Sequence, residues 1–396
     1  MDVLSVASGV RGESRVQKRN LLSLVIVHIA NDSYFGFLPP LLPLIVARMD
    51  LPLSLAGLLA SMFSFSGAVG QPLFGYFSDR FRKGGLIALG PIGGALMTLL
   101  VYMPNYASML LLLFIAGAGS ACFHPVASVI ASEISGKRKG FGVSVYVAGG
   151  RIGVGLGAAL STFLVTTWGL ESIPLGGLLG VAVGMPFFFI APKIKNPLAD
   201  SQMDLWETIR ALSKIIHPLS IMWLVNLCRT TVTIVVSTYM PLYIVASGGS
   251  IGAGGRALTL FLFAAAIGGV YGGYLSDRIG RRVVMIGGLL LGTPLLGVTF
   301  LMPEPYRTVF LMISGAVLYS PMGVSVTYAQ EVAPENKALV SGFMMGVVWF
   351  FGSMIAIGVG ALGDVFGIIP VLPAATVVVG GIGAVISFAL PALDRA

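Results

Sequence analysis

Long apolar segments, separated by short polar stretches, follow one another along almost the whole sequence. A segment of about 20 apolar residues crosses a bilayer as a helix, because a helix satisfies its own backbone hydrogen bonds where water is absent. Hydrophobic residues make up 56% of the chain and charged residues 10%, whereas soluble domains carry about 25% charged residues. The sequence therefore predicts an all-α integral membrane protein whose apolar side chains face lipid.

Twelve of these segments are long enough to span a membrane, in two groups of six. The first group is 20–46, 54–77, 85–103, 107–131, 140–166 and 172–191, and the second is 217–246, 256–275, 283–302, 308–330, 338–361 and 367–390. Between them, apolar residues recur at helical spacing with charges on the other faces, which is typical of an amphipathic helix on a membrane surface. We expect an N-terminal bundle over 1–191, a cytoplasmic linker over 192–216 and a C-terminal bundle over 217–396.

A six-residue pattern occurs once in each half. Residues 75–80 read Gly-Tyr-Phe-Ser-Asp-Arg and residues 273–278 read Gly-Tyr-Leu-Ser-Asp-Arg. The offset is 198 residues (273 − 75), which is half of the 396-residue chain. Paired repeats of a membrane unit are typical of secondary transporters, whose substrate sites lie between the repeats near the middle of the bilayer.

The basic residues predict the orientation of the chain. If both termini are cytoplasmic, Arg48, Arg256 and Arg307 lie on the opposite side, and Arg151 and Arg229 lie inside spans. The other 19 of the 24 Lys and Arg residues (24 − 3 − 2) are then cytoplasmic, as the positive-inside rule requires. The net charge of +8 is therefore a topology signal, and no nucleic-acid partner is expected.

The second copy of the pattern continues as Ile-Gly-Arg-Arg over 279–282. It resembles the loop motif of the major facilitator superfamily, Gly-x-Leu-Ala/Ser-Asp-Arg-x-Gly-Arg-Arg/Lys, which lies between the second and third helices and often recurs between the eighth and ninth. The first copy differs, with Phe77 in place of Leu, and with Arg82 and Lys83 where Gly and Arg would stand. The resemblance covers the whole chain and implies the major facilitator fold, twelve helices in two pseudo-symmetric bundles.

Shorter motifs are similar to the fosmidomycin-resistance group of efflux pumps. They are His-Ile-Ala-Asn-Asp over 28–32 in the first span, Phe-His-Pro over 123–125 in the fourth, and Gly149-Gly150 in the fifth. Where that group carries Gly-Pro in the fifth helix, this chain has Gly157-Ala158. The resemblance implies a proton-coupled exporter in the cytoplasmic (inner) membrane of a bacterium.

Polar residues at membrane depth are costly and mark function. His28, Asn31 and Asp32 share one face of the first span. The 198-residue offset carries His28 to Asn226 and Asn31 to Arg229 in the seventh span. In the superfamily these two spans line the central cavity, so the resemblance implies that the polar faces of the first and seventh spans lie opposite each other across it.

Each of these residues has a candidate role. Asp32 is the only acidic residue well inside a span, so we expect it to carry the coupled proton; a structural pair with Arg151 or Arg229 is the alternative. The two arginines suit an anionic substrate, unless they pair with Asp32 or with helix-end carbonyls. His124 binds substrate, relays protons or bonds across helices. Trp349 lies 198 residues after Arg151 (349 − 151), so we expect it at the cavity.

The repeated motif also supplies candidate gates. They are Asp79, Arg80 and Glu133 in the first half, and Asp277, Arg278 and Glu331 in the second. A carboxylate can bind the exposed amides of a neighbouring helix, and the adjacent Arg can pair with an acid. We expect two cytoplasmic latches that hold the halves together; topology charges at the membrane edge are the alternative.

Glycines in the fifth span form a surface on which another helix can pack closely. They are Gly149, Gly150, Gly153, Gly155 and Gly157, and we expect their partner to be a helix of the other half. Prolines in the first span, Pro39, Pro40 and Pro43, interrupt its backbone bonding and predict a bend.

These features predict a secondary active transporter that exports a small drug-like or anionic compound in exchange for protons by alternating access. Proton-coupled import or exchange of an organic anion or metabolite is the alternative, and a membrane sensor or scaffold is a third possibility. The sequence shows no metal-ligand cluster, nucleophile–base set or phosphate-binding loop, so we expect no enzyme activity, cofactor or metal. The expected partners are the substrate, the proton and the lipid bilayer, and we expect a monomer.

Overall fold

The computed structural model describes residues 3–66, 87–121, 123–134, 139–190, 216–332, 340 and 343–391, with the side chains of the first helix from Asn20 onward. The regular elements in these ranges are all helical, which confirms the all-α prediction. Asp79, Arg80 and nearly all of the expected linker over 192–216 lie outside the described residues. Glu133 is placed on a helix, but its side chain is not described.

The first half of the chain forms α1 (Val3–Phe37), η1 (Pro39–Leu41), α2 (Leu42–Met49), the helix Leu53–Ser66, α4 (Leu89–Ala95), η3 (Leu96–Tyr102), α5 (Tyr106–Ala121), α6 (Phe123–Ile134), α7 (Lys139–Trp168), η5 (Leu170–Gly176) and α8 (Gly177–Ile190). The second half forms α10 (Ile216–Ala246), α11 (Ile251–Ile279), α12 (Arg281–Leu301), α13 (Tyr306–Tyr319), α14 (Met322–Val332), η6 (Phe343–Val347), α16 (Val348–Phe366) and α17 (Ile368–Ser387).

The predicted spans match these helices. In the described part of the chain, nine helical segments are long and apolar enough to cross a membrane. Three shorter apolar helices, Leu53–Ser66, Leu89–Tyr102 and Tyr106–Ala121, occupy the positions of the other predicted spans. Nine and three together account for the twelve expected segments.

Prolines shape the first span as expected. The backbone leaves α1 at Phe37, tightens into the 3-10 turn η1 over Pro39–Leu41, and continues as α2. Because Pro39, Pro40 and Pro43 have no amide hydrogen, this stretch cannot keep an unbroken α-helical ladder. The span therefore changes direction between α1 and α2.

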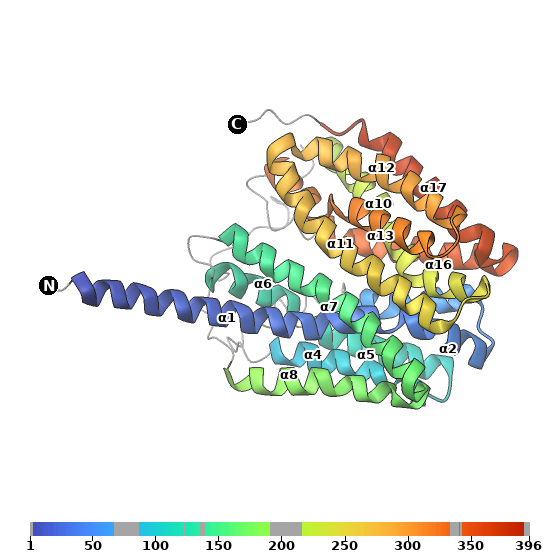
Figure 1. Cartoon of the computed structure of the whole chain (residues 1–396), viewed down its shortest axis with the longest axis horizontal. Helices are drawn as coiled ribbons and strands as arrows, with labels where there is room; N and C mark the ends of the chain where they lie inside the picture. The colour runs from blue at the N-terminus through green and yellow to red at the C-terminus, as the bar shows by residue number, and fades with distance from the viewer. Residues whose placement is uncertain are drawn as a thin grey trace.

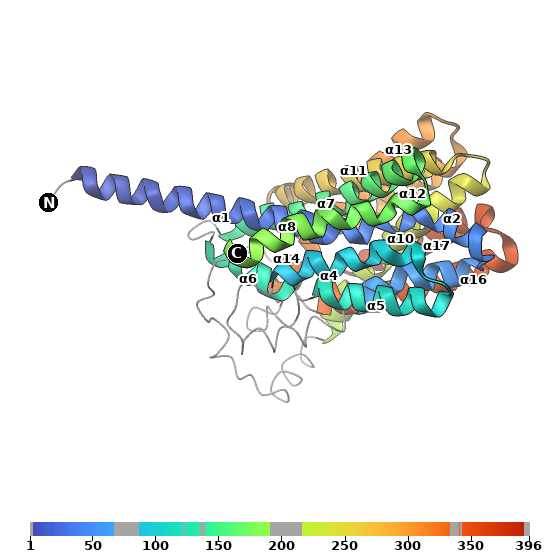
Figure 2. The ribbon, with the colours of Figure 1, turned by 90° about the horizontal axis from the view of Figure 1, so that it is seen from below.

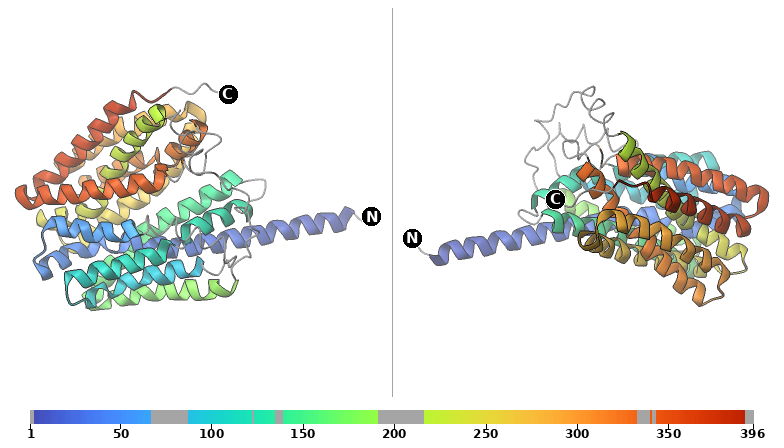
Figure 3. Two further views of the ribbon diagram at one scale, coloured as in Figure 1. Left: turned by 180° about the vertical axis from the view of Figure 1, so that it is seen from behind. Right: turned by 90° about the horizontal axis from the view of Figure 1, so that it is seen from above.

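The helices form two groups, α1–α8 and α10–α17, which lie side by side (Figure 1). The start of α1 and the end of α17 lie at the same end of the molecule, as the views from below, behind and above also show (Figures 2 and 3). Within the groups, α1 packs along α7 and α10 packs along α17. Between the groups, α7 packs along α11, and α10 contacts α2.

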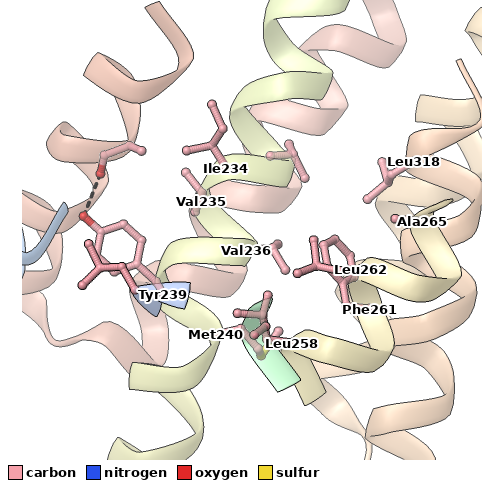
Figure 4. Packing of buried hydrophobic residues seen from close by; sticks show 14 of the residues in the cluster. Ile234, Val235, Val236, Tyr239, Met240, Leu258, Phe261, Leu262, Ala265 and Leu318 are labelled. Carbon is pink, nitrogen blue, oxygen red and sulfur yellow. Dashed lines mark hydrogen bonds between the residues drawn. The ribbon is translucent and has the colours of Figure 1, made fainter. Parts of the chain in front are cut away.

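The two groups share one apolar core. A buried cluster contains Tyr34 and Phe37 of the first group together with Tyr239 and Phe261 of the second. Figure 4 shows part of it, where Val236, Met240 and Phe261 of α10 and α11 lie against one another. A second, smaller cluster around Leu24 and Phe123 contains residues of the first group only.

The glycines of α7 correct one expectation from the sequence. At Gly149, Gly153 and Gly157 an added Cβ would meet Val25, Ile29 and Ser33 of α1. The partner is therefore a helix of the same half, and only Gly155 faces α11, at Phe263. Both helices advance by four residues between contacts, because this spacing keeps side chains on one helical face.

This packing predicts that Gly157→Ala destabilises the protein. The new Cβ would lie 2.9 Å from the Ser33 Cα, and backbone cannot move aside as a side chain can. Overpacking of this kind costs about 1–3 kcal/mol, so the melting temperature of the detergent-solubilised protein should fall. Gly287→Ala in α12 is the control, because no heavy atom lies within 4 Å of its Cβ. Equal melting temperatures for the two variants would contradict the tight α1–α7 contact.

Candidate functional site

His28 is held in a fixed orientation between α1 and α7. Its ring is buried, and Nδ1 lies 2.8 Å from the backbone oxygen of Tyr146. The imidazole also stacks on the Tyr146 ring, with centroids 4.1 Å apart and planes at 21°. Because a carbonyl oxygen only accepts hydrogen bonds, Nδ1 carries a hydrogen and donates it.

Asp32 lies between two histidines. The Nε2 of His28 is 3.1 Å from Asp32 Oδ2, and the Nε2 of His124 is 3.4 Å from Oδ1. At the 3.1 Å of the His28 contact, two facing lone pairs would repel each other, so a hydrogen lies between Nε2 and the carboxylate oxygen. Since His28 already carries a hydrogen on Nδ1, the His28–Asp32 pair holds one more proton, either on Nε2 or on the carboxyl group.

Neutral groups complete the surroundings of Asp32. The Nδ2 of Asn31 donates to Asp32 Oδ1 at 3.0 Å, and Ser120 Oγ donates to Asn31 Oδ1 at 3.0 Å. On the α7 side, a Cβ at Gly150 would lie 2.5 Å from both Asp32 Oδ2 and His28 Nε2. Glycine at 150 therefore makes room for the histidine–carboxylate pair, a role that the sequence pattern alone did not reveal.

His28, Asp32 and His124 could share one small cation. The ligand atoms of the three side chains all lie within 4.8 Å of one another. A proton is the smallest cation that satisfies this arrangement, and the hydrogen-bond geometry already requires one between His28 and Asp32. In the described part of the chain, Asp32 forms its ion pairs with these histidines and not with Arg151 or Arg229.

Arg229 is a buried cation whose described partners are neutral. The residue is 3% exposed. Its Nε and Nη2 donate to Asn226 Oδ1 at 3.2 and 2.8 Å, and Nη2 also donates to Thr230 Oγ1 at 2.9 Å. Asn226 is itself oriented by donating Nδ2 to the Met344 backbone oxygen at 2.8 Å. Hydrogen bonds to neutral oxygens orient the guanidinium but leave its charge uncompensated.

Arg151 reaches from the first group of helices into the second. Its Cζ lies 5.5 Å from the ring centroid of Trp349 and 5.7 Å from that of Tyr319, within the range of cation–π attraction. The structure therefore brings together Arg151 and Trp349, which the 198-residue offset had paired. Arg151 is also close enough to His124 and Arg229 for the charges to interact.

The C-terminal gate residues are arranged differently from the expectation. Arg281, not Arg278, joins the two acids, because its guanidinium donates to Asp277 and, through Nε, to Glu331 Oε1 at 3.2 Å. Arg278 instead lies over the Tyr274 ring at 4.4 Å. Gly280, with φ of 101°, reverses the chain after α11 and brings Arg281 back over the end of that helix. The contact joins α11 to α14 within one half and does not link the two halves.

A bundle of apolar helices in two groups, with buried charges where the groups meet, defines a membrane transporter. The Major Facilitator Superfamily model matches residues 24–357, and the chain belongs to this family. It is therefore a transporter and not an enzyme, which confirms both expectations from the sequence.

Two relatives and one solved structure are similar along most of their length. The uncharacterized MFS-type transporter YfnC of Bacillus subtilis (strain 168) is 27% identical over 360 residues, covering 89% of this chain and 88% of the relative. The fosmidomycin resistance protein of Escherichia coli (strain K12) is 26% identical over 360 residues, covering 86% of each chain. A bacterial homologue of the human lysosomal transporter Spinster has the same fold, with a TM-score of 0.78, 18% identity, and coverage of 94% of this chain and 96% of that one.

The anchoring of His28 predicts different effects for two substitutions. Tyr146→Phe keeps the backbone oxygen and the stacked ring and removes a buried hydroxyl that has no hydrogen-bond partner among the described side chains, so transport and melting temperature should not fall. His28→Phe leaves the Asp32 carboxyl without its nearest proton partner, so transport should be lost. A loss of transport in Tyr146→Phe would show that the hydroxyl, not the backbone oxygen, fixes the site.

The gate geometry predicts which arginine is coupled to Glu331. In thermal melts, the effects of Arg281→Gln and Glu331→Gln should be non-additive by about 0.2–1 kcal/mol, the usual size for exposed ion pairs. The effects of Arg278→Gln and Glu331→Gln should add. Coupling between Arg278 and Glu331 in place of Arg281 would overturn this assignment.

Proposed function

We propose that this protein exports a small compound with an anionic group in exchange for protons. Arg151 and Arg229 bind the anion, and His28, Asp32 and His124 hold the coupled proton. The observation that carries the proposal is the charge balance of the site. Arg151 lies against aromatic rings and Arg229 donates to neutral oxygens, while Asp32, the one nearby acid among the described side chains, already contacts two histidines.

The charge balance favours an anionic ligand because buried cations are stable only when they are paired. Arg229 is almost fully buried, and its hydrogen bonds go to Asn226 and Thr230. Removing a charge from water costs several kcal/mol unless an opposite charge offsets it. A carboxylate or phosphate-like group between Arg151 and Arg229 would supply that charge, and guanidinium groups bind such ligands through two parallel hydrogen bonds.

Export in exchange for protons requires that substrate and proton compete. A substrate with a hydrogen-bond donor beside its anionic group could offer that donor to Asp32 and take the place of the coupled proton. The fosmidomycin resistance protein among the relatives supports export. Access would alternate between the two sides as the groups of helices move against each other, with both termini in the cytoplasm of a bacterium and the chain acting as a monomer in its cytoplasmic (inner) membrane. The bundles over 1–191 and 217–396, joined by the linker, would be the moving bodies.

One observation favours a second candidate, import or exchange of an organic anion together with protons. Arg151 lies within electrostatic range of His124, so a proton on the histidine–aspartate cluster adds positive charge beside the anion site. Positive charge strengthens the binding of an anion. If the anion makes no contact with Asp32, proton and substrate would bind together and move in the same direction.

Flux measurements in proteoliposomes separate the two candidates. Vesicles with an acidic interior should accumulate fosmidomycin or benzoate from outside if protons leave as substrate enters, which is exchange. Vesicles with an alkaline interior should accumulate the substrate if proton and anion enter together. If the flux of either compound does not depend on the pH gradient, both proton exchange and proton co-transport would be contradicted.

Substitution of Arg229 tests the anion site. Arg229→Gln removes the buried charge and should weaken benzoate or fosmidomycin binding at least 10-fold, because hydrogen bonds to a charged partner contribute about 1.5–3 kcal/mol. Arg256→Gln is the matched control, since Arg256 is an exposed arginine at the start of α11. Unchanged affinity in Arg229→Gln, measured by calorimetry on purified protein, would remove Arg229 from the binding site.

A further inference from the structure

A carboxylate of one half binds the beginning of a helix in the other. Asp364, near the end of α16, accepts hydrogen bonds from the backbone amides of Leu53 and Ser54, the second at 3.1 Å. These residues begin the helix Leu53–Ser66, and Pro52 before them has no amide hydrogen. The next two amides, of Leu55 and Ala56, donate to the Pro52 oxygen. Asp364 therefore satisfies the two free donors at this helix start, which have no partner inside the helix.

The same two helices remain in contact from this point toward the middle of the molecule. Ser61 Oγ donates to the Ser353 oxygen at 3.5 Å, and the rings of Phe65 and Phe350 have centroids 5.3 Å apart. The residue number rises along one helix and falls along the other, so they pack antiparallel across the two halves. The Asp364 contact is the outermost of these contacts between the helix Leu53–Ser66 and α16.

Glycines on α16 allow the close approach. A Cβ at Gly360 would lie 2.7 Å from the Leu53 oxygen, and a Cβ at Gly363 would lie 2.9 Å from Leu53 Cδ1. Tyr239 of α10 supports the contact, because its hydroxyl donates to the Ala356 oxygen at 2.9 Å and lies 3.3 Å from the Leu53 oxygen. Figure 4 shows Tyr239 with its hydrogen bond drawn. Three elements therefore meet at the start of the helix Leu53–Ser66.

We infer that Asp364 is a latch that holds this end of the transporter closed and must release Leu53 and Ser54 before substrate can pass on this side. We call this region the Asp364 end. A carboxylate at a helix N-terminus is stabilised by the free amides and by the helix dipole. Among the described residues, Asp364 makes the one carboxylate contact between the two halves. The contacts of Asp277 and Glu331 with Arg281 lie within the second half.

The latch rests on the proposed alternation of access but not on proton coupling or on the identity of the substrate. Asp364 is exposed, so its hydrogen bonds compete with water and can be broken and remade without a large penalty. With the predicted orientation, both termini being cytoplasmic, the Asp364 end faces away from the cytoplasm. Release of the latch would then open the site to the outside.

Distance measurements between spin labels test the latch without any substrate. Labels at Ala107→Cys and Ser247→Cys, in a background with Cys122 and Cys228 replaced by serine, sit on exposed residues at the Asp364 end in the first and second halves. Tyr106, next to the first label, donates its hydroxyl to the Leu55 oxygen at 2.9 Å, so this label reports on the helix that Asp364 caps. Pulsed electron paramagnetic resonance then gives the populations of closed and open forms in the full-length protein.

Asp364→Ala should shift the ratio of open to closed forms about fivefold toward open, the size expected for loss of a helix cap. Asp364→Asn keeps a hydrogen-bond acceptor but not the charge, so it should give a smaller shift in the same direction. It keeps the test decisive if Asp364→Ala fails to fold. Glu171→Ala is the control, because it removes an exposed acid of η5. An unchanged ratio in Asp364→Ala, or the same shift in Glu171→Ala, would overturn the latch. Loss of proton-driven flux with an intact fivefold shift would count against the proposed coupling and not against the latch.

Discussion

The hydrogen bond from His28 to the Tyr146 backbone oxygen determines the chemistry of the site. It places a hydrogen on Nδ1 and leaves Nε2 facing Asp32. A proton must therefore lie between His28 and Asp32, whichever of the two carries it. The α1–α7 contact makes this possible, because glycines let the helices approach until Gly150 lies directly over the pair. A larger residue at position 150 would separate the atoms that share the proton.

Several polar residues of the two halves do not follow the 198-residue symmetry. In the first half, the position of Asn31 contributes to a network that ends on a carboxylate, whereas its equivalent Arg229 in the second half is a buried cation with neutral partners. Arg151 connects the two by lying against Trp349 and Tyr319. Under the proposed function, the proton-binding groups and Arg151 lie on the first half, and Arg229 lies on the second. In that proposal, movement of one half relative to the other would change the distance between the proton site and Arg229.

The sequence predicted the spans well because apolar length is a local property that each segment carries by itself. The 198-residue offset relates Arg151 to Trp349, and the structure places the two side chains in contact, a contact that the offset by itself does not predict. Contacts that depend on a turn or on the choice of a neighbouring helix were not predictable. Gly280 redirects the chain so that Arg281 replaces Arg278 at Glu331, and the glycines of α7 specify close packing without specifying α1 as the partner. Asp364 and Leu53 are 311 positions apart, and no motif links them.

The proposed coupling depends most on a proton held at Asp32. Asp32→Asn keeps the size of the side chain and a hydrogen-bonding group but removes the ionisable carboxyl. In proteoliposomes, this variant should still exchange labelled substrate for unlabelled substrate across the membrane, because neither direction then needs a net proton movement. It should no longer accumulate substrate when a pH gradient is imposed. Accumulation driven by the pH gradient in Asp32→Asn would contradict the account.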